Sequence, residues 1–156
     1  MANSHVFISS TTLASAVSSF TISSIPSTYR DLIISFKGDT GGNAYWRLQF
    51  NADTTAANYP YVAFNGNAST AGNDYARTWG VASLGNNALM HVMDYSVGDK
   101  YKTVISRNNG SGGGSTEFGT MLVQHWNSTA AINSLTFQTL GTFPIGTSVN
   151  VYGVLA

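Results

Sequence analysis

The chain has 156 residues, 43% of them hydrophobic, which is long enough for one domain with a sizeable core and too apolar for intrinsic disorder. Only 9% of the residues are charged, against roughly 25% in a typical soluble domain, and seven basic residues balance seven acidic ones. A neutral chain whose arginines stand singly is not expected to bind nucleic acid, and a chain without cysteine has no disulfide, thiol catalysis or Cys-ligated zinc.

The N-terminal segment, residues 1–19, is predicted to be an arm or the first strand. The short apolar run at residues 5–8 favours a strand. The stretch from Leu13 to Phe20 follows helical spacing, but it is short, rich in serine and uncapped, which disfavours a helix. The start lacks the basic and apolar regions of a signal peptide, and no stretch approaches the ~20 apolar residues of a membrane span. We therefore expect a chain made in a cytoplasm, with no membrane partner.

Two strands with a clear period of two come next. In the runs 32–36 and 44–50 the strongly apolar residues share one parity, which places them on one face of an extended strand. Trp46 and Leu48 are therefore predicted core residues. The Gly- and Asn-rich stretch 38–43 tolerates positive φ, as a tight connection requires, so we expect these strands to form a hairpin.

The middle of the chain is less regular. Residues 51–60 are predicted to be a polar loop, and residues 61–64 a short strand. Residues 68–87 are rich in Gly and Asn but carry three large apolar side chains, so we expect a long loop that packs on the domain. Loops of this length in compact domains are often functional or assembly elements.

The remaining chain is dominated by strand patterns. The Gly/Ser-rich stretch 108–115 is predicted to be an exposed loop tip, and the run after it is apolar on both faces, as in a central strand. The predicted strands lie at residues 88–95, 101–107, 118–126, 132–140 and 149–155.

Together these runs give about nine or ten strands with turn signals at short intervals. A parallel sheet would need interleaved helices, so the pattern favours an antiparallel sandwich or barrel. Eight core strands in two Greek keys would make a jelly roll. We predict one all-β domain, residues 1–156, folded as an antiparallel, jelly-roll-like β-sandwich.

The residues of common catalytic and metal sites do not occur at the required spacing. His91 and His125 lie in predicted strands and have no carboxylate or second histidine at metal-ligand spacing, so both are interpreted as hydrogen-bonded strand residues. Glu117 is the only glutamate, whereas glycoside hydrolysis needs two carboxylates. Asn51-x-Asp53, with Asn58 downstream, offers oxygen ligands for calcium but lacks the charge density of an EF-hand loop. We predict no catalytic residue, no metal and no cofactor.

Aromatic side chains are the more suggestive candidates. The chain has eight Tyr and three Trp residues, and such side chains stack on sugar rings or anchor protein interfaces. A role in the core is the alternative for each of them. The candidates for interface or glycan contacts, which lie in or beside the polar loops, are Tyr45, Tyr59, Tyr61, Tyr75 and Trp79.

Three stretches resemble proteins of tailed-bacteriophage virions. Residues 20–32 are similar to a segment with an Ile-Pro-x-x-Tyr-x-x-Leu core that those proteins often carry. Residues 47–51 and 58–59 are the counterparts of their Arg-Leu-x-Phe-Asn strand and Asn-Tyr pair. Residues 143–154 resemble their terminal Phe-x-x-Gly-Ser-x-x-x-x-Tyr-Gly pattern, with one extra residue, Thr147, before the serine. The matches span most of the chain, except residues 68–87.

This resemblance implies a β-sandwich trimer that is either a capsid decoration (cement) protein or a short fibre or tail-tip protein. We therefore expect a non-enzymatic structural protein that forms a homotrimer, binds the major capsid protein on the outer capsid surface of a virion, and stabilises the shell. The alternative is a tail-fibre or receptor-binding module that recognises host glycan. The resemblance implies no catalytic residue for either function.

Overall fold

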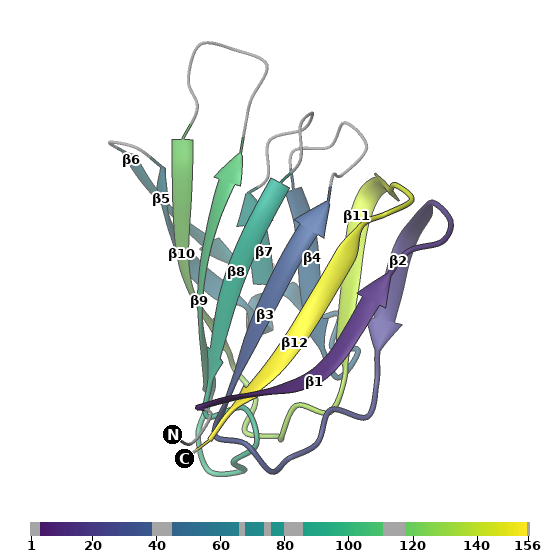
Figure 1. Ribbon diagram of the computed structural model, residues 1–156. Coiled ribbons are helices and arrows are strands. Elements are labelled where there is room, and N and C mark those ends of the chain that lie inside the picture. The colour runs from purple at the N-terminus through teal and green to yellow at the C-terminus, as the bar shows by residue number, and fades with distance from the viewer. Residues whose placement is uncertain are drawn as a thin grey trace.

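A computed structural model describes residues 4–38, 45–65, 68–73, 76–79, 86–110 and 118–155. Two antiparallel sheets pack face to face as a sandwich in one domain (Figure 1). The larger sheet has eight strands, in the order β1 (His5–Thr12), β12 (Ser148–Val154), β3 (Asp31–Gly38), β8 (Asn86–Met93), β9 (Lys102–Gly110), β10 (Phe118–Trp126), β5 (Pro60–Asn65) and β6 (Ala68–Asn73). The smaller sheet has four, in the order β2 (Val17–Ile22), β11 (Leu135–Phe143), β4 (Tyr45–Phe50) and β7 (Ala76–Trp79).

The strand order is that of a jelly roll with two insertions. The chain crosses between the sheets at each step from β1 to β4, and the four-strand sets β1-β12-β3-β8 and β2-β11-β4-β7 face each other. The pairs β5–β6 and β9–β10 are inserted before β7 and before β11, and all four strands add to the larger sheet beyond β8. The predicted all-β, jelly-roll-like sandwich is confirmed.

Aromatic side chains form the centre of the core. Phe36 of β3 stacks on Trp46 of β4, with ring centroids 4.3 Å apart. Phe137 of β11 lies 5.6 Å from Trp46, and Phe143 lies 5.8 Å from Phe36. All four side chains are at most 1% exposed, and they come from both sheets. Such contacts add to the free energy gained from burying the apolar area itself.

The parity prediction for residues 32–36 and 44–50 is confirmed, since Trp46 and Leu48 are both 0% exposed. The predicted hairpin is wrong. β3 pairs with β12 and β8, whereas β4 pairs with β11 and β7, so the connection crosses from one sheet to the other. Its residues, 39–44, lie outside the described residues. A period of two identifies the buried face of a strand but not its neighbours, because both sheets bury that face in the same core.

Residues 13–20, which have a weak helical pattern, are irregular up to residue 16 and then enter β2, because pairing with β11 outweighs a weak local preference. The predicted long loop at residues 68–87 is wrong in part, since it contains β6 and β7 and the start of β8. Both β6 and β7 lie at sheet edges, where backbone hydrogen bonds to one neighbour hold a strand whose sequence has little apolar alternation.

The strand predicted at residues 132–140 begins later, at Leu135. Ile132 is buried but irregular, and its N–H donates to the carbonyl of Tyr95 at 2.9 Å rather than to a strand. The predicted loop tip at residues 108–115 is strand up to Gly110, and the remainder lies outside the described residues. Phe118–Trp126 is a central strand as predicted, between β9 and β5.

Replacing Trp46 with Ala should lower the free energy of unfolding by ~3–5 kcal/mol, because it removes the ring at the centre of the core and leaves a cavity. A urea melt followed by circular dichroism measures this loss. The control Tyr101→Ala, at a position that is 57% exposed, should change the same quantity by less than about 1 kcal/mol. A loss of under about 1 kcal/mol for Trp46→Ala would contradict its central role.

Candidate functional site

The outer face of the eight-stranded sheet, which points away from the core, carries a row of mainly apolar side chains. Cross-strand pairing links one outward residue from every strand at the same height. Side chains directly opposite on neighbouring strands contact each other, so the row is continuous. This lower row runs Phe7, Tyr152, Ile33, His91, Ile105, Val123, Val62 and Ala71.

A second row crosses the same face two residues further along the strands. Its half on β1, β12 and β3 is polar, whereas its half from β8 to β5 contains large side chains around one arginine. This upper row runs Ser10, Asn150, Ser35, Leu89, Arg107, Met121, Phe64 and Ser69. Val62, Phe64 and Met121 are between 39% and 44% exposed, which leaves large apolar groups in water. A contiguous exposed apolar area of this kind is typical of an interaction site.

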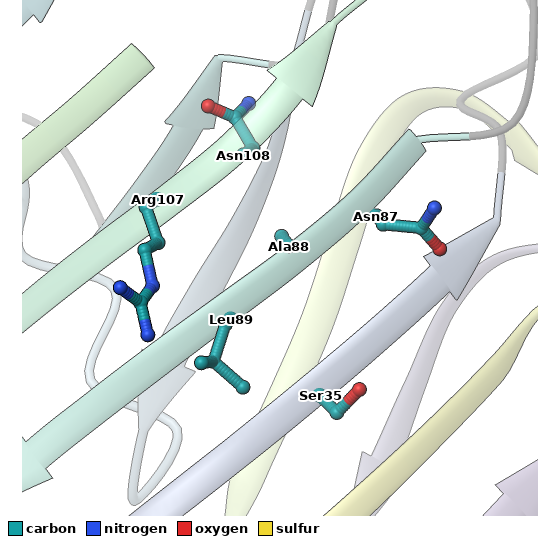
Figure 2. Close-up of a pocket in the computed structure, with 6 residues that line it drawn as sticks. All are labelled: Ser35, Asn87, Ala88, Leu89, Arg107 and Asn108. Carbon is teal, nitrogen blue, oxygen red and sulfur yellow. The ribbon is translucent and has the colours of Figure 1, made fainter. Parts of the chain in front are cut away.

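Two shallow depressions meet at Leu89 and Arg107. The polar one has a volume of about 480 Å³ and is shown in Figure 2, with Ser35, Asn87 and Asn108 among its lining residues. The apolar one has a volume of about 260 Å³, and besides the two shared residues it is lined by Ile33, His91, Ile105 and Met121. Arg107 thus stands between a hydrogen-bonding depression and an aliphatic one.

The carboxylate of Asp31, which lies on β3 next to the lower row, already has hydrogen-bond partners within the protein. Asp31 is 4% exposed and accepts hydrogen bonds from Arg30 at 2.9 Å, from His91 Nε2 at 3.1 Å and from the backbone N–H of Asp94 at 2.9 Å. Burial alone raises the pKa of Asp31, but these hydrogen bonds and the charge of Arg30 outweigh it and hold that pKa below its ordinary value. The interpretation of His91 as a hydrogen-bonded strand residue is confirmed.

The loop after β4 uses its polar groups to hold itself in place. Asp53 accepts hydrogen bonds from Trp126 Nε1 and Asn58 Nδ2, both at 2.8 Å, and from the N–H of Thr55 at 2.9 Å. Asn51 points elsewhere and accepts from the backbone N–H of Asn133 at 2.8 Å. Because these oxygens face N–H donors and diverge, the pattern does not fit calcium. The described residues also contain no group of three or more His, Cys, Asp or Glu side chains that could hold a metal.

Lys102 is a buried cation with a structural task. Its side chain is 0% exposed, and its ammonium donates to the carbonyls of Val97, Lys100 and Thr129, the last two at 2.8 and 3.1 Å. Burial lowers the pKa of Lys102. The ammonium of Lys102 therefore links the loop before β9 to the loop after β10. All three of its protons are used in these hydrogen bonds, so it has no donor left for a ligand.

The five aromatic candidates are not brought together as one site among the described side chains. Tyr59 is 0% exposed, and its hydroxyl accepts from the N–H of Phe50 at 3.1 Å, so its predicted role as a surface contact is wrong and it is a core residue. Tyr61 is half-buried and lines a depression of about 150 Å³ with Val62, Val123 and His125. Tyr75 and the side chains of Tyr45 and Trp79 lie outside the described residues.

The residues that carry the resemblance to virion proteins are mostly structural. Gly153 lies so close to the ring of Tyr29 that a Cβ on it would come within 2.2 Å of that ring, so the Tyr-Gly pair allows the Ile-Pro-x-x-Tyr segment to pack on β12. Gly146 has a φ of 85°, which suits glycine at the turn before β12. These motifs therefore specify the sandwich. The outer face was missed by sequence analysis because its two rows form only when all eight strands pair, and each strand contributes one residue to a row.

Lowering the pH should destabilise the protein through Asp31. A carboxyl whose folded pKa is depressed contributes stability above its unfolded pKa of about 4 and loses it as the pH falls through the folded pKa. The free energy of unfolding, from urea melts at about pH 5 and about pH 2, should therefore fall less in Asp31→Asn than in the wild type. The control Asp99→Asn, in an exposed loop, should keep the wild-type loss; an unchanged loss in Asp31→Asn would contradict the assignment.

Comparison of the chain with protein-family models, with curated proteins and with solved structures gave no match. Within the described ranges, no helix is long and apolar enough to cross a membrane. The candidate site is therefore defined by the geometry of this chain alone: a broad, largely apolar outer sheet face, with Arg107 between two depressions.

Proposed function

We propose that the protein is a non-enzymatic structural protein of a bacteriophage virion, a capsid decoration (cement) protein that binds the outer shell as a homotrimer. The resemblance of residues 20–32, 47–51 and 143–154 to virion proteins motivates the phage assignment. The observation that carries the structural role is the apolar outer face of the eight-stranded sheet. A sheet that faces water on one side normally carries polar residues there, so an apolar outer face supports contact with another protein.

The buried charged groups of the described chain support a non-catalytic role. Asp31 and Lys102 are both hydrogen-bonded to groups of the protein, and Asp53 is bound to a tryptophan and an asparagine. Catalytic acids and bases instead need an accessible position beside a substrate. The accessible surface is mainly apolar or neutral, which suits lattice assembly.

The mechanism is linkage between binding and lattice stability. A protein that binds the assembled shell and not the separate subunits shifts the assembly equilibrium toward the shell by mass action. A modest free energy of binding per copy is multiplied by the many copies on one particle. The partner is the major capsid protein, and the location is the outer capsid surface.

The second candidate function is a tail-fibre or receptor-binding module for host glycan. The polar depression at Arg107 favours it, because Ser35 and Asn87 supply a hydroxyl and an amide group and Leu89 supplies an apolar surface. Copy number separates the two functions: hundreds of copies per virion, measured by quantitative mass spectrometry of purified particles, indicate decoration, and a few copies indicate a fibre.

The homotrimer should persist in high salt, because with few charged residues its contacts must be mainly apolar or neutral. At about 1 M NaCl the Debye length is ~3 Å, which weakens exposed ion pairs but not apolar burial. Multi-angle light scattering at low and high salt measures the mass. A monomer at low salt would refute the trimer, and dissociation only at high salt would show that charge holds the subunits together.

Adding the purified protein to particles that lack it should raise the temperature at which the shell opens. The expected shift grows with occupancy and stops at saturation, because the protein stabilises only the state that it binds. Fluorescence of a DNA-binding dye during heating reports shell opening. Bovine serum albumin at the same concentration is the control, and an unchanged opening temperature at saturating protein would contradict the decoration function.

A further inference from the structure

We infer that the outer face of the eight-stranded sheet binds a segment of the capsid protein that places a carboxylate on Arg107 and an aliphatic side chain in the depression beside it. This inference rests on the proposed function and names the surface and chemistry of its contact. It depends on the charges of this face, on the shape beside Arg107 and on the symmetry of a contact between two copies.

Among the described residues, the outer face has positive charge without a free negative partner. Arg107 and Lys37 point outward on β9 and β3, and both side chains are exposed. In the part of the chain that the structure describes, Arg107 has no ion pair, and the carboxylate at the lower end of the face, Asp31, is bound by Arg30 and His91. Charge complementarity therefore calls for a carboxylate from the occupant.

The apolar depression adjoins the guanidinium directly. The walls are mainly aliphatic, with Arg107 on one side and the imidazole of His91 on another; the aliphatic lining residues are Ile33, Leu89, Ile105 and Met121. Arginine and methionine surrounded by apolar side chains are enriched at the centres of protein interfaces. Arginine binds carboxylates frequently in a bidentate and therefore directional way, so a carboxylate on Arg107 would fix the position of the neighbouring aliphatic group.

A second copy of the same face does not meet this requirement. A two-fold contact places the same patch against itself, so among the described residues it brings arginine and lysine to the face but no free carboxylate. Elsewhere in the described chain, Asp53 is hydrogen-bonded to Trp126 and Asn58, Asp94 lies 3.7 Å from Lys100, and Asp99 is exposed in the loop before β9. An acidic segment of a different protein therefore meets the requirement, whereas a copy in a two-fold contact does not. A copy that presents Asp99 in another geometry is distinguished by the cross-link described below.

The test uses particles purified without the protein and compares binding of purified variants by sedimentation. Arg107→Gln should bind at least tenfold more weakly, because it leaves the partner's carboxylate buried and unpaired. The affinity of Lys37→Gln, which removes a charge at the edge of the same face, should stay within about twofold of the wild type.

The apolar depression is tested in the same assay. Met121→Asp should also bind at least tenfold more weakly, whereas Leu140→Asp, on the exposed side of β11, should stay within about twofold of the wild type. Thermal melts and light scattering confirm folding and oligomeric state.

The acidic partner is identified with Arg107→Lys and a carbodiimide, which joins amines to carboxylates. Mass spectrometry should find a new cross-link from position 107 to an Asp or Glu of the capsid protein that is absent in the wild type. Loss of the oligomer in Met121→Asp, or a cross-link to another copy, would show that this face joins copies of the chain. Normal binding of Arg107→Gln would overturn the inference alone. Failure of the wild type to bind particles would refute the proposed function and, with it, the capsid partner.

Discussion

The stacking of aromatic side chains between the two sheets is the interaction on which the rest of the structure depends. Phe36 and Trp46 come from consecutive strands that lie in opposite sheets, Phe137 comes from the distant strand β11, and the contacts among the three hold the sheets face to face. Because each of the first three connections crosses from one sheet to the other, neither sheet can be completed from neighbouring segments alone. The core and the strand order therefore have to form together, and the free energy of burying these rings stabilises both.

Because the two sheets differ in size, part of the inner face of the larger sheet has to be covered by something other than the smaller sheet. Four strands cannot cover the inner face of eight, so the part of the larger sheet formed by β10 and β5 needs another cover. The end of β4 and the loop after it supply this cover: the ring of Phe50 lies 5.6 Å from the ring of Trp126, Tyr59 is fully buried, and Asp53 accepts a hydrogen bond from the indole N–H. A stretch that looks like a polar surface loop in the sequence thus contributes Tyr59 to the core.

The outer face of the larger sheet leaves apolar side chains exposed to water, whereas the interior satisfies its buried charges. Inside the domain, the buried charges Asp31 and Lys102 have protein partners that offset the cost of removing them from water. On the outer face, Val62, Phe64 and Met121 stay in water although their burial would be favourable. The strands inserted into the jelly roll, β5 and β10, carry all three of these residues, so the insertions enlarge the sheet and also supply its most apolar outer surface. Burial of this surface by another protein connects the fold to the proposed role in assembly.

The sequence by itself determined the class of fold and the buried face of most strands. Period-two patterns placed Trp46 and Leu48 in the core correctly, because alternation along one strand is a local property that the chain carries in every context. Composition also indicated a surface of neutral polar and apolar groups rather than ion pairs.

Only the tertiary structure decided which strands are neighbours, and with that the candidate site. The hairpin expected between the runs 32–36 and 44–50 does not form, because a strand's apolar parity is compatible with either sheet. Asp31 meets His91 across 60 positions, and Arg107 meets Leu89 and Met121 from two other strands, so neither group has a signal within one segment. Tyr59 was misassigned for the same reason: its loop is polar by composition, and it is buried only because the larger sheet extends past the smaller one.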